Sequence, residues 1–207
     1  INKTICTRPE SETAIRKLTL AQAKQFDCGS KRAEAFPRQQ PVPGARIPTL
    51  DEVLAPPPRG SFWFNTEMKP TPDKPDLPPA PEAFARLVAD AVRKHKLEKR
   101  VVVQSFDWRT LKAMKAIAPG IKLAALYGGL PKDFVKIAEE AGGVPIVSPH
   151  HLLVTRGQVE AAHKAGLEVV PWTPNTPAHW DRLIGAGVDS IITDDPAALI
   201  EHLRNRK

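Results

Sequence analysis

Two charged side chains near the end of a predicted strand have the types and spacing of a site for a phosphate group and a metal ion. Glu67 and Lys69 lie two residues apart, so in an extended chain they point to the same face of a sheet. A carboxylate suits a hard divalent cation such as Mg²⁺ or Ca²⁺, and an ammonium suits a phosphate oxygen. The alternative interpretation is a solvated ion pair at a strand end, and the two residues alone leave both open.

Further candidates stand at the ends of two later predicted strands. Gln104 and Phe106 share one face of a strand at 101–106, so an amide and an apolar wall could line one pocket. Alternatively, Phe106 belongs to the core and Gln104 caps a backbone group. Trp172 ends a strand at 168–172 and could form a flat wall for a small polyol, although a buried tryptophan is the more common case.

Other polar residues near the strand ends have structural interpretations. Asp107, Asn175 and Asp195 each precede a predicted helix, and short polar side chains are favoured as helix caps. His150 and His151 could supply a general base or a metal ligand. No carboxylate lies near them in the sequence to orient either ring, so a packing or surface role is favoured.

The segments that would position these side chains alternate regularly after residue 60. Strands are expected at 61–68, 101–106, 121–127, 144–148, 168–172 and 189–193, and helices at 82–98, 108–118, 132–141, 156–165, 178–186 and 197–205. Apolar strands separated by amphipathic helices indicate a parallel sheet covered by helices. The six units are fewer than the eight of a closed barrel, and the glycine-rich phosphate loop of an open doubly wound sheet is absent. The sequence thus leaves two alternatives, an open sheet with an unusual site and a barrel without its first strands, and the lack of an initiator methionine at position 1 favours the second.

The first part of the chain has a different composition. Of the 22 prolines, thirteen fall between positions 37 and 81, which indicates loops interrupted by short helices. One short helix is expected within 18–26, capped by Thr19. A second is expected within 47–54, where Thr49 and Glu52 have the spacing of a capping box.

Composition excludes several classes of protein. The 207 residues are 42% hydrophobic and 26% charged, as in soluble globular domains. No apolar run approaches the roughly 18 residues that a membrane span needs. The net charge of +7 permits attraction to anions, but nothing resembles an aromatic platform for nucleic acid. Cys6 and Cys28 are too few for a disulfide-built scaffold or a cysteine-rich zinc site, and one bridge and two free thiols both stay open.

Five motifs, in order along the chain, resemble those of the glycerophosphodiester phosphodiesterases of bacteria. They lie at 47–54 (IPTLDEVL), 65–69 (NTEMK), 104–106 (QSF), 172–175 (WTPN) and 191–196 (IITDDP). The resemblance covers essentially the whole chain and implies an α/β fold, a (β/α)₈ TIM barrel that hydrolyses glycerophosphodiesters to glycerol 3-phosphate and an alcohol. It implies a divalent cation, Mg²⁺ or Ca²⁺, with Glu67 as a metal ligand. It also implies that Lys69, Gln104, Phe106 and Trp172 bind the substrate.

The sequence departs from the family pattern in its first part. The His-Arg-Gly, Glu-x-Asp and His-Asp motifs of the family are absent, so the catalytic histidine pair and two of the three metal ligands are not in this chain. We therefore expect residues 1–207 to be the C-terminal three quarters of one catalytic domain, with a proline-rich insertion at about 30–60. The partner of this chain would be the missing N-terminal segment of the same domain, and the chain by itself is expected to be inactive.

The resemblance also bears on where the protein is located, and it leaves two other functions open. The proline-rich insertion is similar to that of exported bacterial members, and a Cys6–Cys28 bridge would suit an oxidising compartment. A periplasmic or secreted protein is expected, with a cytoplasmic one as the alternative. A phosphodiesterase of the sphingomyelinase D or phosphoinositide-lipase type stays open, as does a non-catalytic barrel remnant that acts as a binding module.

Overall fold

The computed structural model describes residues 6–7, 14–56, 60–70, 74 and 76–206. Contacts within the chain divide it into two units, residues 1–57 with 71–79 and residues 58–70 with 80–207. The assignment of all 207 residues to one catalytic domain stays a prediction. Within the described residues, no helix has the length and the apolar character needed to cross a membrane.

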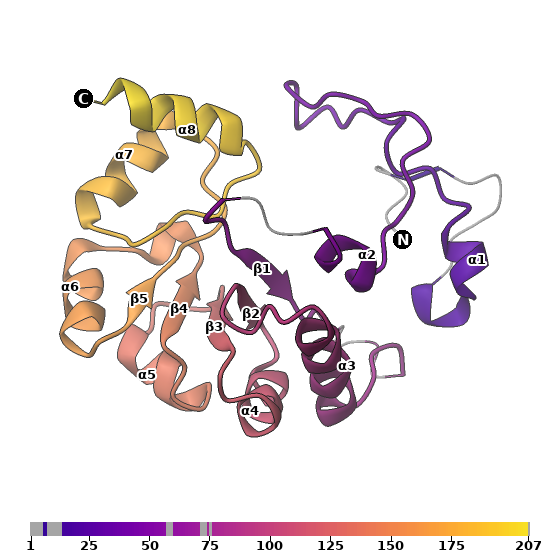
Figure 1. Ribbon diagram of the computed structural model, residues 1–207. Coiled ribbons are helices and arrows are strands. Elements are labelled where there is room, and N and C mark those ends of the chain that lie inside the picture. The colour runs from indigo at the N-terminus through magenta and orange to yellow at the C-terminus, as the bar shows by residue number, and fades with distance from the viewer. Residues whose placement is uncertain (1–5, 8–13, 57–59, 71–73, 75, 207) are drawn as a thin grey trace. The chain divides into compact units, whose positions relative to one another are not determined.

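The second unit contains a parallel sheet of five strands, which follow one another in the order of the chain (Figure 1). The strands are β1 (Phe64–Glu67), β2 (Val101–Ser105), β3 (Lys122–Tyr127), β4 (Ile146–Pro149) and β5 (Glu168–Val169). Isolated parallel bridges from His150 to Trp172 and from Trp172 to Ile192 continue the pairing to a sixth position.

The last two strands are shorter than expected. The segment 168–172 pairs over two residues and again at Trp172, and the expected strand at 189–193 is only a bridge at Ile192. Two local features explain this. Pro171 has no N–H to donate to a neighbouring strand, and the N–H of Val169 donates to the Asp189 carboxylate instead of a strand carbonyl, at 2.7 Å.

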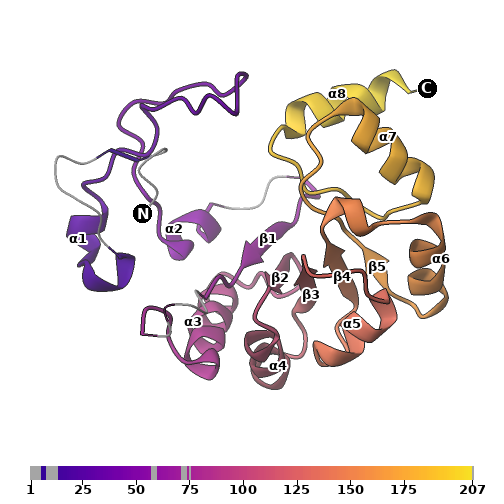
Figure 2. The same cartoon turned by 180° about the vertical axis from the view of Figure 1, so that it is seen from behind.

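Helices cover one face of this sheet (Figure 2). They are α3 (Pro81–Lys94), α4 (Trp108–Ile117), α5 (Phe134–Glu140) and α6 (Arg156–Lys164), with a short 3₁₀ helix, η2 (His151–Leu153), after β4. Two more helices, α7 (Pro177–Ala186) and α8 (Pro196–Asn205), follow β5 along the chain. A doubly wound sheet reverses its strand order and has helices on both faces. The fold is therefore an α/β fold consistent with a (β/α)₈ barrel, and the absence of the first strands stays a prediction.

Side-chain caps fix where the helices begin, and hence how the loops after the strands are placed. The Asp107 carboxylate accepts from the Arg109 N–H at the start of α4, and the Asp195 carboxylate accepts from the Ala198 N–H at the start of α8. Both caps were expected. The cap of α7 is Thr176, and the prediction that Asn175 caps this helix is wrong.

The core lies between the helices and the sheet. Fully buried apolar side chains come from both layers: Val103, Ala125 and Val147 from the strands, and Leu111 and Met114 from α4. Each large apolar side chain buried in this way stabilises the fold by roughly 1.5–3 kcal/mol. The carboxyl ends of the strands are therefore firmly placed.

The described residues of the first unit form a 3₁₀ helix, η1 (Ile15–Lys17), and two short helices, α1 (Leu20–Ala23) and α2 (Leu50–Leu54). Thr19 and Thr49 cap these two helices as expected, each in a complete capping box. Cys6 and Cys28 form a disulfide, which decides between the two alternatives left open by the sequence.

Hydrogen bonds to the Asp27 side chain hold the backbone next to Cys28. The Asp27 carboxylate accepts hydrogen bonds from the Ser30 hydroxyl and from the N–H groups of Gly29, Ser30 and Gly44, and these bonds hold the pKa of Asp27 well below its usual value. A Cβ at Gly29 would lie 2.0 Å from the Val42 carbonyl oxygen. Only glycine fits this close approach of two backbone segments.

Candidate active site

Glu67 and Gln104 are neighbours at the carboxyl ends of β1 and β2. They are register partners in the parallel pair, and paired residues place their side chains on the same face. Asn65 and Gln104 line the cavity on the inner face, opposite the helices, so Glu67, two residues after Asn65, belongs to that face. Gln104 is 8% exposed. The Oε1 atom of Glu67 is buried and has no hydrogen-bond partner among the described residues.

The residues after Glu67 are anchored to β2. Met68 is fully buried, and its N–H donates to the Gln104 carbonyl at 2.9 Å. Its carbonyl accepts from the Ser105 hydroxyl at 2.6 Å. Lys69 follows beyond the end of β1, and its side chain is exposed. The turn that carries both charged candidates is therefore held by buried groups, while the ammonium group is accessible.

Phe106, Trp172 and His150 form an aromatic wall at the carboxyl ends of β2, β5 and β4. The rings of Phe106 and Trp172 meet edge to face, with 5.3 Å between their centres, and the rings of His150 and Trp172 do so at 5.0 Å. Trp172 Nε1 donates to the Ser148 carbonyl at 2.9 Å. Phe106 is 46% exposed, so the alternative that places it in the core is wrong, and Trp172 is half-buried.

Gly128 is a contact of this wall that the sequence analysis missed. A Cβ at this position would lie 3.2 Å from Trp172 Cζ2 and 3.9 Å from Phe106 Cε1. The missing side chain therefore leaves room for the tryptophan ring. The only signal in the sequence is the Gly128-Gly129 pair directly after a predicted strand.

His151 is a packed residue, as the sequence favoured. It is 7% exposed, and its ring stacks between those of His150 and His179, with 4.7 Å to each centre. The Arg182 guanidinium donates to the His151 carbonyl at 2.7 Å. Burial, followed by the charges of His150, His179 and Arg182, lowers the pKa of His151 to about 4. The ring is therefore neutral over the physiological range of pH.

Two other carboxylates near the strand ends are occupied by structural contacts. Both oxygens of Asp107 accept from Arg109, whose guanidinium holds the pKa of that carboxyl below its usual value. Asp194 accepts from the Asn175 amide at 2.7 Å. Across the ranges that the structure describes, no three His, Cys, Asp or Glu residues gather as a metal site. The buried, unpartnered oxygen of Glu67 fits a cation, but as one ligand of several.

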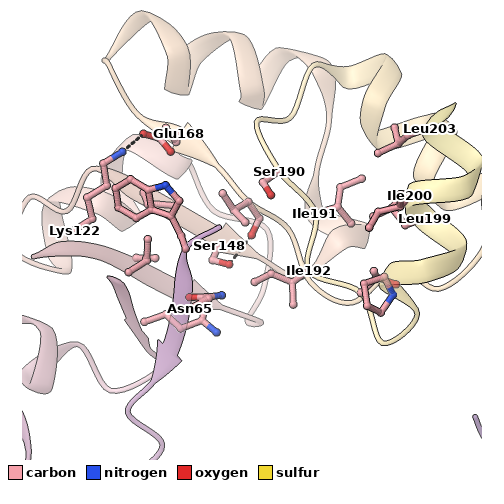
Figure 3. A pocket seen from close by; sticks show the side chains of 18 residues that line it. Asn65, Lys122, Ser148, Glu168, Ser190, Ile191, Ile192, Leu199, Ile200 and Leu203 are labelled. Atoms are coloured by element: carbon pink, nitrogen blue, oxygen red, sulfur yellow. Dashed lines mark hydrogen bonds and ion pairs between the residues drawn. The ribbon is translucent and has the colours of Figure 1, made fainter. Parts of the chain in front are cut away.

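A cavity of about 810 Å³ lies along the inner face of the sheet (Figure 3). Its walls include Gln104 and Ser148 from the strands and an apolar side of α8 with Leu199 and Leu203. At the amino ends of the strands, Lys122 and Glu168 form an ion pair at 2.9 Å, drawn as a dashed line in Figure 3. The cavity thus extends from the Lys122–Glu168 ion pair, at the amino ends of the strands, toward polar side chains nearer their carboxyl ends.

The predicted site residues fall into two adjacent pairs and one exposed cation. Glu67 lies beside Gln104, Phe106 contacts Trp172, and Lys69 faces solvent. A carboxylate, an amide, an ammonium and an apolar wall can together bind a cation, a phosphate group and a short polyol. Such a set at the carboxyl ends of parallel strands has the placement of an active site in barrel enzymes.

Comparisons with known proteins agree with this arrangement. The sequence model of the glycerophosphoryl diester phosphodiesterase family matches residues 4–198 of this chain. The chain is 31% identical over 205 residues to a glycerophosphodiester phosphodiesterase of Caldanaerobacter subterraneus subsp. tengcongensis, a match that covers 98% of this chain and 78% of the relative.

Solved structures share the fold. The crystal structure of a protein from Silicibacter pomeroyi DSS-3 that is named as a glycerophosphoryl diester phosphodiesterase superposes on this chain with a TM-score of 0.88. The two sequences are 24% identical, and the match covers 99% of this chain and 76% of that one. An Oleispira antarctica phosphodiesterase in complex with sn-glycerol-3-phosphate superposes with a TM-score of 0.75 at 23% identity, over 92% and 72%. These comparisons give no support to the expectation of an inactive chain. With a family match over most of its length and a relative that is 31% identical over 205 residues, the chain belongs to the glycerophosphoryl diester phosphodiesterase family.

Proposed function

We propose that this protein hydrolyses glycerophosphodiesters to glycerol 3-phosphate and an alcohol, with a divalent cation bound in part by Glu67. The observation that carries the proposal is the buried Oε1 atom of Glu67, which has no partner among the described residues. A charged oxygen buried without a partner costs free energy, and Mg²⁺ or Ca²⁺ would supply that partner. The family match and the 31% identical relative support the reaction.

Each of the other site residues has a role in binding. When bound, the cation would polarise a phosphoryl oxygen and stabilise the charge that develops there. The exposed Lys69 ammonium attracts the phosphate, and the Gln104 amide orients an oxygen of the substrate. Phe106 and Trp172 cover the carbon face of the glycerol unit. We assign no role as general acid or base to His151, because its ring is buried and packed between two others.

We also propose that further strands of the same domain complete the barrel. Among the described residues, β1 pairs with β2 alone, and Ile192 pairs only through the bridge to Trp172. Both edges thus carry unpaired backbone groups, which native sheets cover. On α8, Ile200 and Leu203, which line the cavity, are 49% and 46% exposed. Covering this surface would stabilise the protein by about 25 cal/mol per Å² and would bring additional ligands to the cation.

The Cys6–Cys28 disulfide supports a periplasmic or secreted location. Such bonds persist in oxidising compartments and are reduced in the cytosol. Intact mass of protein isolated under thiol-blocking conditions tests this proposal, because a bridged protein gains no blocking groups. Two blocked thiols in freshly isolated protein would favour the cytoplasmic alternative.

The test of the reaction uses the 207-residue chain and sn-glycero-3-phosphocholine. We expect hydrolysis, or at least binding of sn-glycerol 3-phosphate, that EDTA abolishes and that Ca²⁺ or Mg²⁺ restores. The Glu67→Gln variant is expected to lose about 100-fold or more of this activity or affinity. Glu160→Gln, which removes an exposed carboxylate on α6, is the matched control and should behave like wild type.

Each outcome of this test has a defined meaning. Hydrolysis by the 207 residues would support the proposed function and would contradict the inactivity that the absent sequence motifs imply. Cleavage of sphingomyelin or phosphatidylinositol, with no reaction on the glycerophosphodiester, would favour the alternative phosphodiesterases. Absence of both hydrolysis and product binding would overturn the proposal and favour a non-catalytic binding module.

A further inference from the structure

We propose that Asn175 and Asp194 are positioning residues that hold Trp172 in place as a wall of the substrate pocket. The inference rests on the proposed function, because it gives Trp172 a substrate-facing role. The two residues belong to the loops after β5 and after the Ile192 bridge, and their side chains join these loops directly. Neither residue is among those that the sequence motifs imply bind the substrate or the metal, and neither belongs to the aromatic wall.

Three hydrogen bonds make this link. The Asn175 amide nitrogen donates to Asp194 Oδ2 at 2.7 Å. The Asn175 amide oxygen accepts from the Thr193 hydroxyl at 2.9 Å and from the Asp194 N–H at 3.0 Å. The amide therefore uses its donor toward a carboxylate and its acceptor toward two donors on the same loop. If the amide were turned over, so that its nitrogen and oxygen changed places, these hydrogen bonds would be lost.

The link acts on the segment that carries Trp172. Trp172 forms a parallel bridge to Ile192, whose N–H donates to the Pro171 carbonyl at 2.9 Å. On its other side, the Trp172 carbonyl accepts from the His151 N–H at 2.7 Å. Pro174, between Trp172 and Asn175, accepts from Trp180 Nε1 at 2.8 Å. The backbone on both sides of the tryptophan is thus fixed, and the Asn175–Asp194 pair closes the outer end of the segment.

The chemistry of the pair makes a specific prediction about exchange of the two residues. Asn175→Asp would place two carboxylates at hydrogen-bond distance, and like charges so close repel. Asp194→Asn is tolerated, because its amide can turn its oxygen toward the Asn175 amide nitrogen. In the double variant, the amide at 194 donates to the carboxylate at 175, and the other two bonds to position 175 are kept. The double variant should therefore recover what Asn175→Asp loses.

The experiment compares these three variants in the full chain by two measurements. Fluorine NMR of protein labelled with 5-fluorotryptophan reports the surroundings of each indole, and Trp172→Phe assigns the Trp172 signal. Calorimetry gives the affinity for sn-glycerol 3-phosphate in the presence of Ca²⁺. Asn205→Asp, at the exposed end of α8, adds the same charge away from the site and is the control.

We expect Asn175→Asp to shift or broaden the Trp172 signal and to weaken product binding by about 3- to 10-fold. The Trp63 and Trp108 signals should not change. Asp194→Asn and the double variant should keep both properties within about twofold of wild type, which is a coupling that distant sites do not show.

Two results would overturn the inference: an unchanged Trp172 signal in Asn175→Asp, or a double variant as impaired as Asn175→Asp. Failure of the proposed function is a separate result, in which wild type itself binds no product. In that case the fluorine signals alone decide whether the pair positions Trp172.

Discussion

Glu67 and Gln104 occupy equivalent levels of adjacent strands, and the residue after Glu67 is fixed by the strand that carries Gln104. The Met68 N–H donates to the Gln104 carbonyl, and the Met68 carbonyl accepts from the Ser105 hydroxyl. A buried backbone group that loses its partner costs about 1–3 kcal/mol. The position of the carboxylate thus depends on β2 as much as on its own strand.

Replacement of Lys69 is expected to weaken substrate binding without loss of stability. The side chain is exposed, and exposed substitutions usually change the free energy of unfolding by less than about 0.5 kcal/mol. Lys69→Met should raise KM for a glycerophosphodiester about tenfold and should reduce its dependence on salt. Lys69→Arg keeps the charge and is the control. A KM for Lys69→Met equal to that of wild type would exclude the phosphate contact.

A methyl group at Gly128 is expected to displace the Trp172 ring. The added carbon would lie 3.2 Å from Trp172 Cζ2, so Gly128→Ala should lower the free energy of unfolding by about 1–3 kcal/mol and weaken product binding. Gly157→Ala in α6, where nothing lies within 4 Å of the added carbon, should instead stabilise by up to about 1 kcal/mol. Urea denaturation and calorimetry of both variants check the prediction. Equal behaviour of the two alanine variants would contradict it.

Stability is expected to fall as the pH drops from about 6.5 to about 4, because of His151. Its pKa is lowered from 6.5 to about 4 in the folded protein, so in this window the unfolded chain binds a proton that the folded chain does not. The contribution is therefore complete above pH 6.5 and is lost progressively below it, by up to about 3 kcal/mol in total.

Urea denaturation at several pH values, for wild type and His151→Gln, measures this dependence. The variant should show a flatter change of unfolding free energy across the window, since it lacks the titrating ring. His150, His179 and Arg182, the charged or titratable groups around the ring, are kept in both proteins. Identical pH profiles for the two proteins would exclude His151 as the cause.

Removal of the Cys6–Cys28 bridge is expected to loosen the first unit selectively. The bridge closes a separation of 22 residues, for which the chain-entropy account gives about 3 kcal/mol. In the variant with both cysteines replaced by serine, amide hydrogen exchange at Val42 and at position 28 should accelerate about 100-fold, because the folded state there becomes less stable relative to the unfolded chain. The Val103 amide in β2 serves as the internal reference. Equal protection in both proteins would contradict the prediction.

Much of the fold could be predicted from local sequence signals. Asp107 and Asp195 cap their helices, and Thr49 with Glu52 forms a capping box, because these contacts join residues two or three positions apart. Such features depend on few long-range contacts and are therefore visible in the sequence.

The remainder depends on contacts between distant segments. Phe106 lies at the rim, where it contacts Trp172 instead of entering the core. The Asn175 side chain does not cap α7, because it forms three hydrogen bonds with Thr193 and Asp194. The pairing of Cys6 with Cys28 was undecided, since spacing alone does not distinguish a bridge from two thiols. The buried oxygen of Glu67 is likewise a property of the folded sheet, which the residue type does not reveal.

The strictly sequential order of the strands has a consequence for how the second unit folds. In the part of the chain that the structure describes, the strands from β1 to β5 pair in the order of the sequence, so each pairing joins strands that are consecutive in the chain. Structure can then spread from a central nucleus such as β2, α4 and β3 outward, one strand and helix at a time, with a small entropic cost at each step. Substitutions in the central strands should slow folding, whereas those at β1 or α8 should mainly hasten unfolding.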